Sequence, residues 1–454
     1  MIVNILIVGC GKAGSVLAQT LCSEGHDVTV MDTDPEIVRT LVDHFDVQGI
    51  CGNGLILKDL EEAGVENTNI IIAMTESDEI NILCCLMARK SGARHSIARV
   101  RNPAYAEQLV FMREELGVSM MVNPEFQTAN EIARMLRYPN ALHVETFAKG
   151  RLELAELKVS EGGLLDGIQL MDITRKLKLH LLICAVKRDD DIFIPDGSCT
   201  LQAGDRIYIT ATHSELSKFY KQVGDLKNRF RSAVIVGGGR ISFYLTNQLL
   251  ELGMHVKIIE QNLERCEQLS EWFPKAKVIC ADGTDQDILL EEGIADADAF
   301  ITLTGIDEEN IILSLYGKTL GVDKVVTKIN RLSLLPISDS VGLENVVSPK
   351  NTTAALILQY VRAKQNSESS NIITLYRLSD NRLEAVEFIV RNDPDYVGIP
   401  LRDLRVRPGF LIAGIIRGNK LVVPSGNDCL KVNDSVVVVT TNNKLSDLED
   451  IFAL

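Results

Sequence analysis

The chain alternates between short apolar runs and stretches with apolar residues at helical spacing. Continuous apolar runs, the pattern of fully buried strands, occupy residues 4–9, 27–31 and 69–74. After the first run, Val16, Leu17 and Leu21 recur at helical spacing. This alternation of strand and helix predicts a doubly wound α/β sheet with parallel strands.

The same pattern occurs twice along the chain. Residues 4–11 read NILIVGCG, and residues 232–239 read SAVIVGGG. Further on, residues 50–54 read ICGNG, and residues 279–283 read ICADG. The chain is therefore predicted to be a tandem duplication.

The second part of each half has a different pattern. Residues 144–221 and 372–452 are predicted to be small α+β domains, and they match in the motifs IPDG at 194–197 and VPSG at 423–426. In the first of them, strands are predicted at residues 152–157, 181–187 and 206–211, and a helix is predicted at residues 170–177.

The predicted fold is therefore two Rossmann-like doubly wound parallel-sheet domains, each followed by a small α+β domain. The predicted domains are residues 1–125, 143–224, 230–350 and 370–454. The polar run Lys364–Asn371 is the predicted linker of the second half, and the halves are expected to join near Gly224–Arg231. Within the first small domain, Asp189-Asp190-Asp191 could suggest a metal site. A hairpin turn is favoured, because Asp forms turns and the second half has Arg417-Gly418-Asn419-Lys420 there.

A glycine-rich turn follows the first predicted strand. It consists of Gly9, Cys10, Gly11, Lys12, Ala13 and Gly14, and the next strand ends at Asp32. Strand, glycine turn, helix, strand and acid together form the dinucleotide-binding fingerprint. Gly9 permits the tight turn, Gly11 admits a pyrophosphate, and Gly14 allows close helix packing, while the helix N-terminus attracts the phosphates. Asp32 accepts hydrogen bonds from ribose hydroxyls and repels a 2′-phosphate, which favours NADH or an adenosine nucleotide over NADPH.

The second half departs from this fingerprint. Its turn consists of Gly237, Gly238, Gly239, Arg240, Ile241 and Ser242, so a serine occupies the third glycine position. Glu260 replaces Asp32, and Arg240 replaces Lys12. A second working site is expected, because a cation at the turn and an acid at the strand end are kept; a decayed second site is the alternative.

Further positions are expected to face the same crevices, because ligands bind at the carboxyl ends of parallel strands. Near the adenine and its ribose these are Gly52 and Asn53 in the first half, and Asp282 and Gly283 in the second. Near the outer phosphates or the nicotinamide ribose they are Thr75, Glu76 and Thr304, with Arg99 and Lys328 at the ends of the fifth strands. For Asn81 and Asn310, we favour a structural role at the start of a helix.

Composition narrows the possible partners. The net charge of −15 disfavours binding to nucleic acid or to anionic lipid, so any membrane attachment is expected to go through a partner protein. No apolar run approaches the roughly 18 residues of a membrane span, and the N-terminus resembles a buried strand rather than a signal peptide. The ten cysteines form no C-x-x-C pair and are interpreted as buried small apolar residues of a reducing cytosol.

At these residues the chain resembles the RCK family, whose domains regulate potassium conductance. Thr75-x-x-Asp78-Glu79-x-Asn81 and Thr304-x-x-Asp307-Glu308-x-Asn310 add to the glycine turns and acids. The tandem order resembles the cytoplasmic regulators of Trk potassium-uptake systems, and the likeness covers essentially the whole chain.

The resemblance implies a regulatory subunit without catalytic activity. Such chains bind NAD(H), and also ATP or ADP, and assemble as homo-oligomers, dimers or tetramers, into a gating ring. The ring lies on the inner face of the cell membrane, against a transmembrane potassium transporter of TrkH or TrkG type. The nucleotide shifts the ring between conformations and so alters ion flux, to the extent that its affinities for the two states differ.

Two alternatives stay open from the residues themselves. One is an NAD-dependent oxidoreductase, although none of the seven histidines recurs at the matching position of the other half. The other is an RCK-type regulator of a different ion transporter. No metal-binding motif and no nucleophile elbow is present in the sequence.

Overall fold

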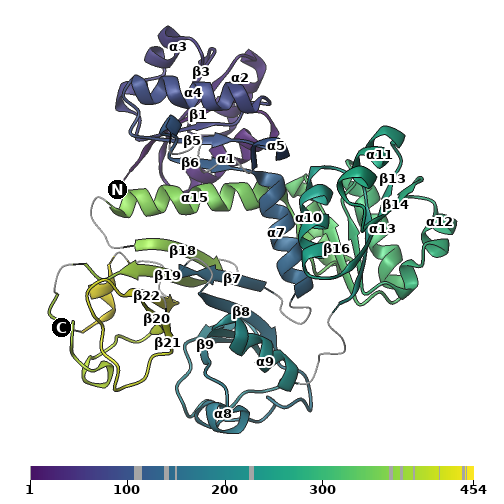
Figure 1. The fold of residues 1–454 in the computed structure, drawn as a ribbon. Coiled ribbons are helices and arrows are strands. Elements are labelled where there is room, and N and C mark those ends of the chain that lie inside the picture. Colours follow the sequence, from purple (N-terminus) through teal and green to yellow (C-terminus); the bar gives the residue numbers. More distant parts are fainter. Residues whose placement is uncertain are drawn as a thin grey trace. The chain divides into compact units, whose positions relative to one another are not determined.

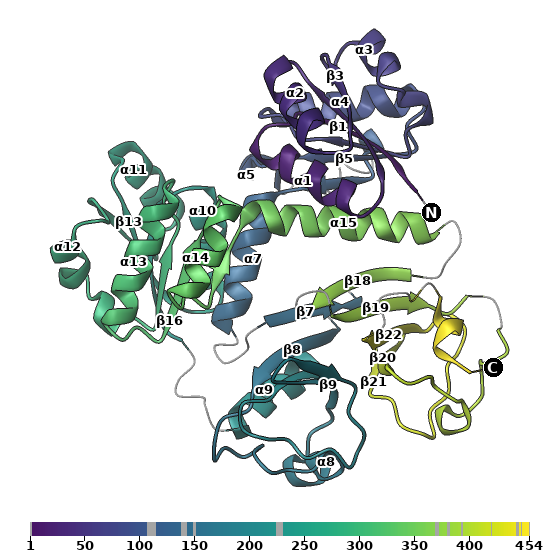
Figure 2. The ribbon, with the colours of Figure 1, turned by 180° about the vertical axis from the view of Figure 1, so that it is seen from behind.

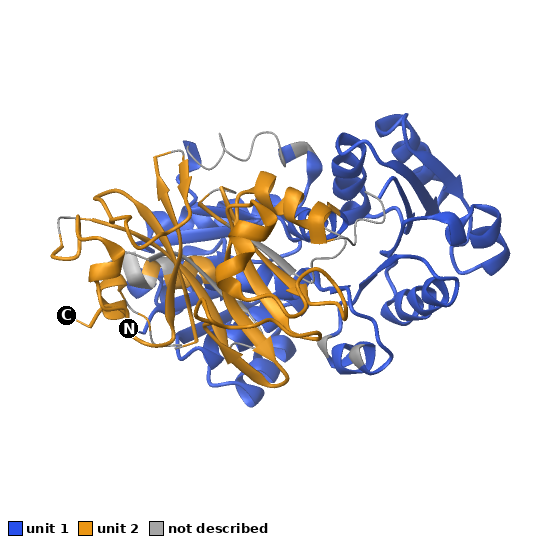
Figure 3. Ribbon diagram, turned by 90° about the horizontal axis from the view of Figure 1, so that it is seen from below, with its two compact units in different colours: residues 1–136, 230–358 blue, residues 137–229, 359–454 orange. Residues whose placement is uncertain are grey.

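The structure is a computed structural model, and it forms two compact units that each combine parts of both halves (Figure 3). Unit 1 spans residues 1–136 and 230–358, and unit 2 spans residues 137–229 and 359–454. The described residues are 2–106, 115–137, 143–148, 151–223, 230–367, 372–378, 382–391, 394–418, 420–441, 445 and 447–453. The A-B-A-B order of the sequence thus becomes a pairing of like domains in space.

The first sheet of unit 1 is parallel, with the strand order β3-β2-β1-β4-β5-β6 (Figure 1). Its strands are β1 Asn4–Val8, β2 Asp27–Asp32, β3 Gln48–Cys51, β4 Ile70–Ala73, β5 His95–Arg99 and β6 Met120–Val122. The helices are α1 Lys12–Ser23, α2 Pro35–His44, α3 Leu57–Glu62, α4 Asp78–Lys90, α5 Pro103–Ala106 and α7 Pro124–Arg137. Because β1 pairs with β2 on one side and with β4 on the other, the strand order reverses between β1 and β4. The crevice of a doubly wound sheet lies at this switch point, beyond the carboxyl ends of the strands.

The second sheet repeats this topology in the order β14-β13-β12-β15-β16-β17. Its strands are β12 Ser232–Val236, β13 His255–Glu260, β14 Lys277–Cys280, β15 Ala299–Thr302, β16 Lys324–Lys328 and β17 Val346–Val347. The helices are α10 Arg240–Glu251, α11 Leu263–Trp272, α12 Gln286–Glu291, α13 Asp307–Thr319, α14 Leu335–Ser340 and α15 Pro349–Ser367. The central strands β4 and β15 are buried at every residue, as their continuous apolar runs predict.

Two helices tie the Rossmann domains of unit 1 together. Helix α7 follows the first sheet in the chain, yet its buried Ile132 and Leu136 belong to the same core as Ile235 and Leu245 of the second domain. In Figures 1 and 2, α15 follows the second sheet, and its part in unit 1, residues 349–358, lies beside α7, where Thr352 Oγ1 donates to Glu131 Oε2 at 2.9 Å. The last helix of each Rossmann domain thus contacts the other half of the chain.

Unit 2 contains two antiparallel five-stranded sheets with matching orders, β10-β9-β11-β8-β7 and β21-β20-β22-β19-β18. The first small domain comprises β7 His143–Phe147, β8 Leu152–Lys158, α8 Leu170–Leu177, β9 Leu182–Arg188, β10 Asp191–Phe193, β11 Arg206–Ala211 and α9 His213–Val223. The second comprises β18 Ile372–Leu378, β19 Leu383–Ile389, β20 Phe410–Arg417, β21 Lys420–Val422 and β22 Ser435–Thr440. Side chains of both sheets, including Leu154, Tyr208, Ala413 and Val437, share one buried core.

The fold class expected from the sequence is confirmed, and the predicted helix at residues 170–177 coincides with α8. The linker prediction was wrong in part, because α15 continues to Ser367. Residues 364–367 contain no proline or glycine to end the helix, and residues 368–371 lie outside the described residues. The expected join between the halves falls mostly on residues 224–229, which are also not described.

The aspartate run of the first small domain forms a turn, as expected. Asp189 has a positive φ of 52°, and the strands β9 and β10 on either side of the turn pair antiparallel. Among the described residues no group of three or more potential ligands could hold a metal ion. None of the described helices is long and apolar enough to cross a membrane.

Two candidate nucleotide crevices

Both glycine turns lead directly into a helix whose N-terminus has no side-chain cap. Gly11 precedes α1, Gly239 precedes α10, and neither helix receives a capping hydrogen bond from a side chain. By contrast, Asp34 caps α2 and Ser77 caps α4. The first N–H groups of α1 and α10 are therefore available to an anion, and the helix dipole favours one there.

The glycines of the first turn meet different constraints. Gly9 has a φ of +87°, and a Cβ on it would lie 2.6 Å from the backbone nitrogen of Thr75. A Cβ on Gly14 would lie 2.2 Å from the carbonyl oxygen of Gly9. A Cβ on Gly11 would meet no atom within 4 Å, and the same holds for Gly239. Gly9 and Gly14 are therefore required by the turn itself, whereas Gly11 and Gly239 border open space that a phosphate could occupy.

The two acids at the strand ends reach back to the glycine turns. Asp32 Oδ2 accepts a hydrogen bond from the N–H of Cys10 at 2.6 Å. In the second half, Glu260 Oε2 accepts from the N–H of Gly238, also at 2.6 Å. The longer glutamate thus reaches the equivalent donor, and both carboxylates lie at the junction of turn and second strand, where a ribose would bind.

The second crevice forms a cavity of about 460 Å³. Eight of the positions predicted in the second half line it, namely Gly237, Gly238, Gly239, Glu260, Asp282, Gly283, Thr304 and Lys328. Hydrogen bonds from the backbone and hydroxyl of Thr284 lower the pKa of Asp282, so this carboxylate is anionic at the edge of the crevice. Arg240 and Ile241, which were also predicted, are not among the lining residues; Arg240 is exposed and Ile241 is buried.

The remaining predictions of the first half lie around the carboxyl ends of its strands. Lys12, Asn53 and Glu76 are exposed, and Ala13, Gly52 and Thr75 are partly buried. The N–H of Asn53 donates to Asp59 Oδ2 at 2.7 Å, which fixes the loop after β3.

A cation stands at the end of the fifth strand in each half. Arg99 Nη2 donates to the carbonyl of Thr75 at 2.6 Å, and Lys328 Nζ donates to the carbonyl of Leu303 at 3.3 Å. Burial lowers the pKa of both groups. Arg99 Nε is buried without a hydrogen-bond partner among the described residues, so this side chain retains an unused donor.

Asn81 and Asn310 have a structural role, as favoured from the sequence, but they bond the ends of two strands and not only the start of a helix. Asn81 Oδ1 accepts from the N–H of Thr75, and its amide donates to the carbonyls of Thr75 and Arg99. Asn310 repeats this arrangement with Thr304 and Lys328. Each asparagine therefore joins the ends of the fourth and fifth strands rather than facing a ligand.

Comparison with known proteins matches both kinds of domain. The TrkA-N domain family matches residues 5–124 and 233–349, and the TrkA-C domain family matches residues 154–224 and 385–453. A Trk system potassium uptake protein TrkA homolog of Archaeoglobus fulgidus is 33% identical over 450 residues, which cover 99% of this chain and 100% of the homolog. The Trk system potassium uptake protein TrkA of Halomonas elongata is 31% identical over 456 residues, covering 99% and 98%.

The chain belongs to the TrkA family. Among solved structures, the GsuK channel bound to NAD has the same fold, with a TM-score of 0.65 and 20% identity, over 97% of this chain and 77% of that one.

In this TrkA-family chain, a hydrogen-bonded group links the two crevices within unit 1. The hydroxyl of Tyr244, on α10, donates to the carbonyl of Arg101 at 3.2 Å, and Asn123 Nδ2 donates to the Tyr244 hydroxyl at 2.9 Å. Asp78 Oδ2 accepts from the N–H of Arg101 and thereby holds the loop after β5. Because α10 begins at the second glycine turn, the end of the first crevice is joined to the helix that borders the second.

Glu125, at the start of α7, lies among cations of both crevices. Its Oε1 is 3.6 Å from Arg101 Nη1, and its charge acts on Arg99 and on Lys328. Its Oε2 is buried without a hydrogen-bond partner among the described residues. Neither Glu125 nor Tyr244 was predicted from the sequence, because contacts between the halves are not visible in the periodicity of either half.

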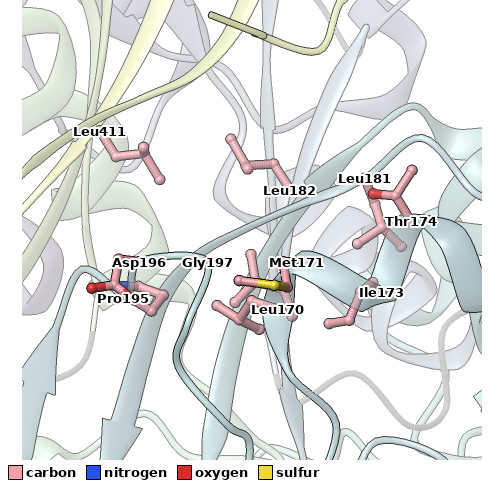
Figure 4. A pocket seen from close by; sticks show the side chains of 11 residues that line it. Leu170, Met171, Ile173, Thr174, Leu181, Leu182, Pro195, Asp196, Gly197 and Leu411 are labelled. Carbon is pink, nitrogen blue, oxygen red and sulfur yellow. The ribbon is translucent and has the colours of Figure 1, made fainter. Parts of the chain in front are cut away.

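Unit 2 of the TrkA-family chain contains a smaller cavity of about 170 Å³ (Figure 4). Its lining is mainly aliphatic, with Leu170, Met171 and Leu182 from the first small domain and Leu411 from the second. Hydrogen bonds from Ser198 lower the pKa of Asp196, the acid at its edge. This lining includes no lysine or arginine, so it does not repeat the phosphate-binding arrangement of unit 1.

Proposed function

We propose that the chain is a nucleotide-responsive regulatory subunit of a Trk-type potassium-uptake system. The observation that carries this proposal is the pairing of two linked crevices in one unit, each with an uncapped helix N-terminus, a ribose-facing acid and a cation at the end of the fifth strand. The proposed ligands are NAD(H) and the adenosine nucleotides ATP and ADP. The relatives named as potassium-uptake proteins support the transport role.

The proposed partner is a transmembrane potassium transporter of TrkH or TrkG type. The chain would act in the cytoplasm, at the inner face of the cell membrane, and would meet the membrane only through this partner. The net charge of −15 supports this, because an acidic surface is repelled by anionic lipid. A ligand then changes ion flux only by binding the two states of the assembly with different affinity.

A homo-oligomer, as a dimer or tetramer in a gating ring, is part of the proposal. Helices α4 and α13 expose large apolar side chains at matching positions, since Leu83 is 50% exposed and Ile312 is 65% exposed. Ile80 and Ile306 add to these surfaces. Burying such residues between copies removes apolar area from water. Light scattering at micromolar concentration should report an oligomer, and a monomer would contradict the ring.

One observation favours an oxidoreductase as a second candidate. Burial lowers the pKa of Lys328 at the edge of the second cavity, and perturbed groups in clefts often act as general acids or bases. The counterpart of Lys328 is Arg99, which stays protonated and cannot exchange a proton near neutral pH. A duplicated binding role therefore explains both positions better than catalysis does.

Calorimetric titration of the full chain with NADH, NAD, ATP, ADP and NADPH tests the proposal. We expect saturable binding of the first four at one or two sites per chain, weak binding of NADPH, and no turnover of NADH. Potassium flux through vesicles that contain a Trk-type membrane subunit should then change when the liganded chain is added. Absence of binding by every nucleotide would leave the glycine turns as structural features and overturn the proposal.

A further inference from the structure

Two cysteine side chains meet on the wall of the second crevice. Cys266 lies in the first turns of α11 and is 5% exposed, whereas Cys280 ends β14 and is exposed. The Cys266 thiol points to the carbonyl oxygen of Glu260 at 3.2 Å, and the Cys280 thiol points to that of Gln261 at 3.9 Å. These carbonyl groups belong to consecutive residues, and Glu260 is also the strand partner of Cys280. The two thiols therefore lie close together, and the Cys280 thiol adds to the effect of burial in raising the pKa of Cys266.

The sulfur pair adjoins residues of the candidate nucleotide site. Glu260 and Gln261 both line the cavity of the second crevice. The Glu260 carboxylate accepts hydrogen bonds from the N–H groups of Gly238 at 2.6 Å and Asn262 at 2.8 Å. Movement of the thiols would therefore act on the segment that holds the ribose-facing acid.

The first crevice has the same scaffold, but its two matching positions hold only one sulfur. Cys51 ends β3 and is exposed, and its thiol points to the carbonyl oxygen of Thr33 at 3.8 Å. The α2 position that matches Cys266 is Val38, which is buried. The expectation that the cysteines are buried small residues was wrong for Cys51 and Cys280, because a residue that ends an outer strand of the sheet can face solvent.

We propose that Cys266 and Cys280 are a redox-active dithiol that a hydroperoxide converts to a disulfide, and that this bond weakens nucleotide binding in the second crevice. The exposed Cys280 thiol reacts first with the hydroperoxide ROOH, giving Cys280 sulfenic acid and the alcohol ROH. The Cys266 sulfur then attacks the Cys280 sulfur and forms the S–S bond. The sulfenic hydroxyl leaves with the Cys266 proton as water. The two sulfurs together lose two electrons, which the peroxide O–O bond accepts.

The order of these steps follows from the surroundings of the two thiols. Burial raises the pKa of Cys266 to about 12, so this thiol stays protonated and is a poor first target. A disulfide holds its sulfurs at about 2.05 Å, much closer than two thiols in contact. Its formation must therefore draw the end of β14 and the start of α11, which follows the turn after β13, closer together.

The first test maps the thiols in the full-length reduced protein. After treatment with hydrogen peroxide, free thiols are alkylated, sulfenic acids are trapped with dimedone, and peptides are analysed by mass spectrometry. We expect a Cys266–Cys280 disulfide and a dimedone adduct at Cys51, because Val38 occupies the position of the resolving cysteine in the first half. In Cys266→Val, which carries the first-half residue, the adduct should appear at Cys280 as well. Cys280→Ser should form no such disulfide and serves as the second variant if Cys266→Val is unstable.

The dithiol would be overturned if the unsubstituted chain formed no disulfide and carried as much dimedone adduct at Cys280 as at Cys51.

The second test compares NADH titrations of the reduced and oxidised protein, with oxidised Cys266→Val as the matched control. We expect affinity at the second site to fall about tenfold on oxidation, the equivalent of one charge-assisted hydrogen bond. Unchanged affinity with a complete disulfide would overturn the regulatory effect. The expected loss of affinity rests on the proposed function, whereas the mapping of the thiols does not. If the reduced protein does not bind NADH, the proposed function is rejected, and the thiol map alone decides whether the disulfide forms.

Discussion

The two Rossmann crevices have one topology, and three of the positions at which they differ are ones that a nucleotide would contact or approach. Where the first has Gly14, Asp32 and Arg99, the second has Ser242, Glu260 and Lys328. Both acids nevertheless hold an N–H of the glycine turn at 2.6 Å. The scaffold therefore preserves the position of the carboxylate, while the side chains that deliver it and the nearby cation change.

The third turn position shows how such a change is accommodated. In the first half, a Cβ at Gly14 would lie 2.2 Å from the carbonyl oxygen of Gly9. In the second half, Ser242 carries a Cβ, is fully buried and donates its hydroxyl to the carbonyl of Gly237. The Ser242 hydroxyl thus bonds the Gly237 carbonyl, whose counterpart in the first half, the Gly9 carbonyl, lies directly against the helix. A glycine at this position is thus a requirement of one turn geometry and not of the fold.

The largest expected effect is therefore at Gly14. The substitution Gly14→Ala should destabilise the first Rossmann domain by about 3 kcal/mol, because the added methyl group overlaps backbone that cannot turn away. Ser242→Ala removes one hydrogen bond and should cost about 1 kcal/mol. Denaturant unfolding of the full chain measures both. An equal loss of stability from Gly14→Ala and Ser242→Ala would show that the two turns do not differ in how closely they approach the helix.

A control separates stability from binding in this experiment. Gly11→Ala adds a methyl group where no atom lies within 4 Å, so stability should be unchanged. The same methyl group points into the space expected for phosphate, so nucleotide affinity at the first site should fall. A large loss of stability in Gly11→Ala would contradict the open crevice.

The next largest effect concerns the acids. Asp32→Ala should weaken NADH binding at the first site by roughly 1–3 kcal/mol, the scale of a charge-assisted hydrogen bond. Glu260→Ala should do the same at the second site only, and calorimetry resolves the two if their affinities differ. Asp32→Glu is the matched control, since it installs the second-half acid. If Asp32→Ala leaves affinity at the first site unchanged, the assignment of the ribose-facing acid is wrong.

Some features of the two crevices could be predicted from the sequence, and others could not. Local signals were sufficient for the glycine turns, for the strand-end acids and for α8, because each depends on residues close together in the chain. Tyr244 and Glu125 were missed, because their importance comes from contacts between the halves. The packing of α7 on the second domain is of the same kind, since no local pattern indicates it. The end of α15 was missed for a local reason, since residues 364–367 are polar yet compatible with a helix.

A smaller difference is expected at high pH. Burial lowers the pKa of Lys328 from the ordinary 10.5, so this ammonium loses its proton before an exposed lysine would, whereas Arg99 stays charged. As the pH rises, NADH affinity at the second site should fall by about 1 kcal/mol while the first site keeps its affinity. Because the pKa of Lys328 is lower in the folded than in the unfolded chain, this residue makes the folded state more stable as the pH rises from its folded pKa toward 10.5. The loss of NADH affinity is therefore not caused by unfolding at this residue. Lys328→Arg should remove the pH dependence, and calorimetry with Asp32→Ala isolates the second site.

The smallest expected effect tests whether the crevices act together. Tyr244→Phe removes the hydroxyl that joins the Arg101 carbonyl to α10 and leaves the ring in its T-shaped contact with Phe126. Each site should keep its own affinity, but the change in affinity at one site when the other is filled should shrink by about 0.5–1 kcal/mol. Tyr105→Phe is the matched control, because its hydroxyl bonds Glu79 within the first domain only. Coupling that is the same in both variants would mean that the link between the crevices is carried by the packing of α7, and not by the Tyr244 hydroxyl.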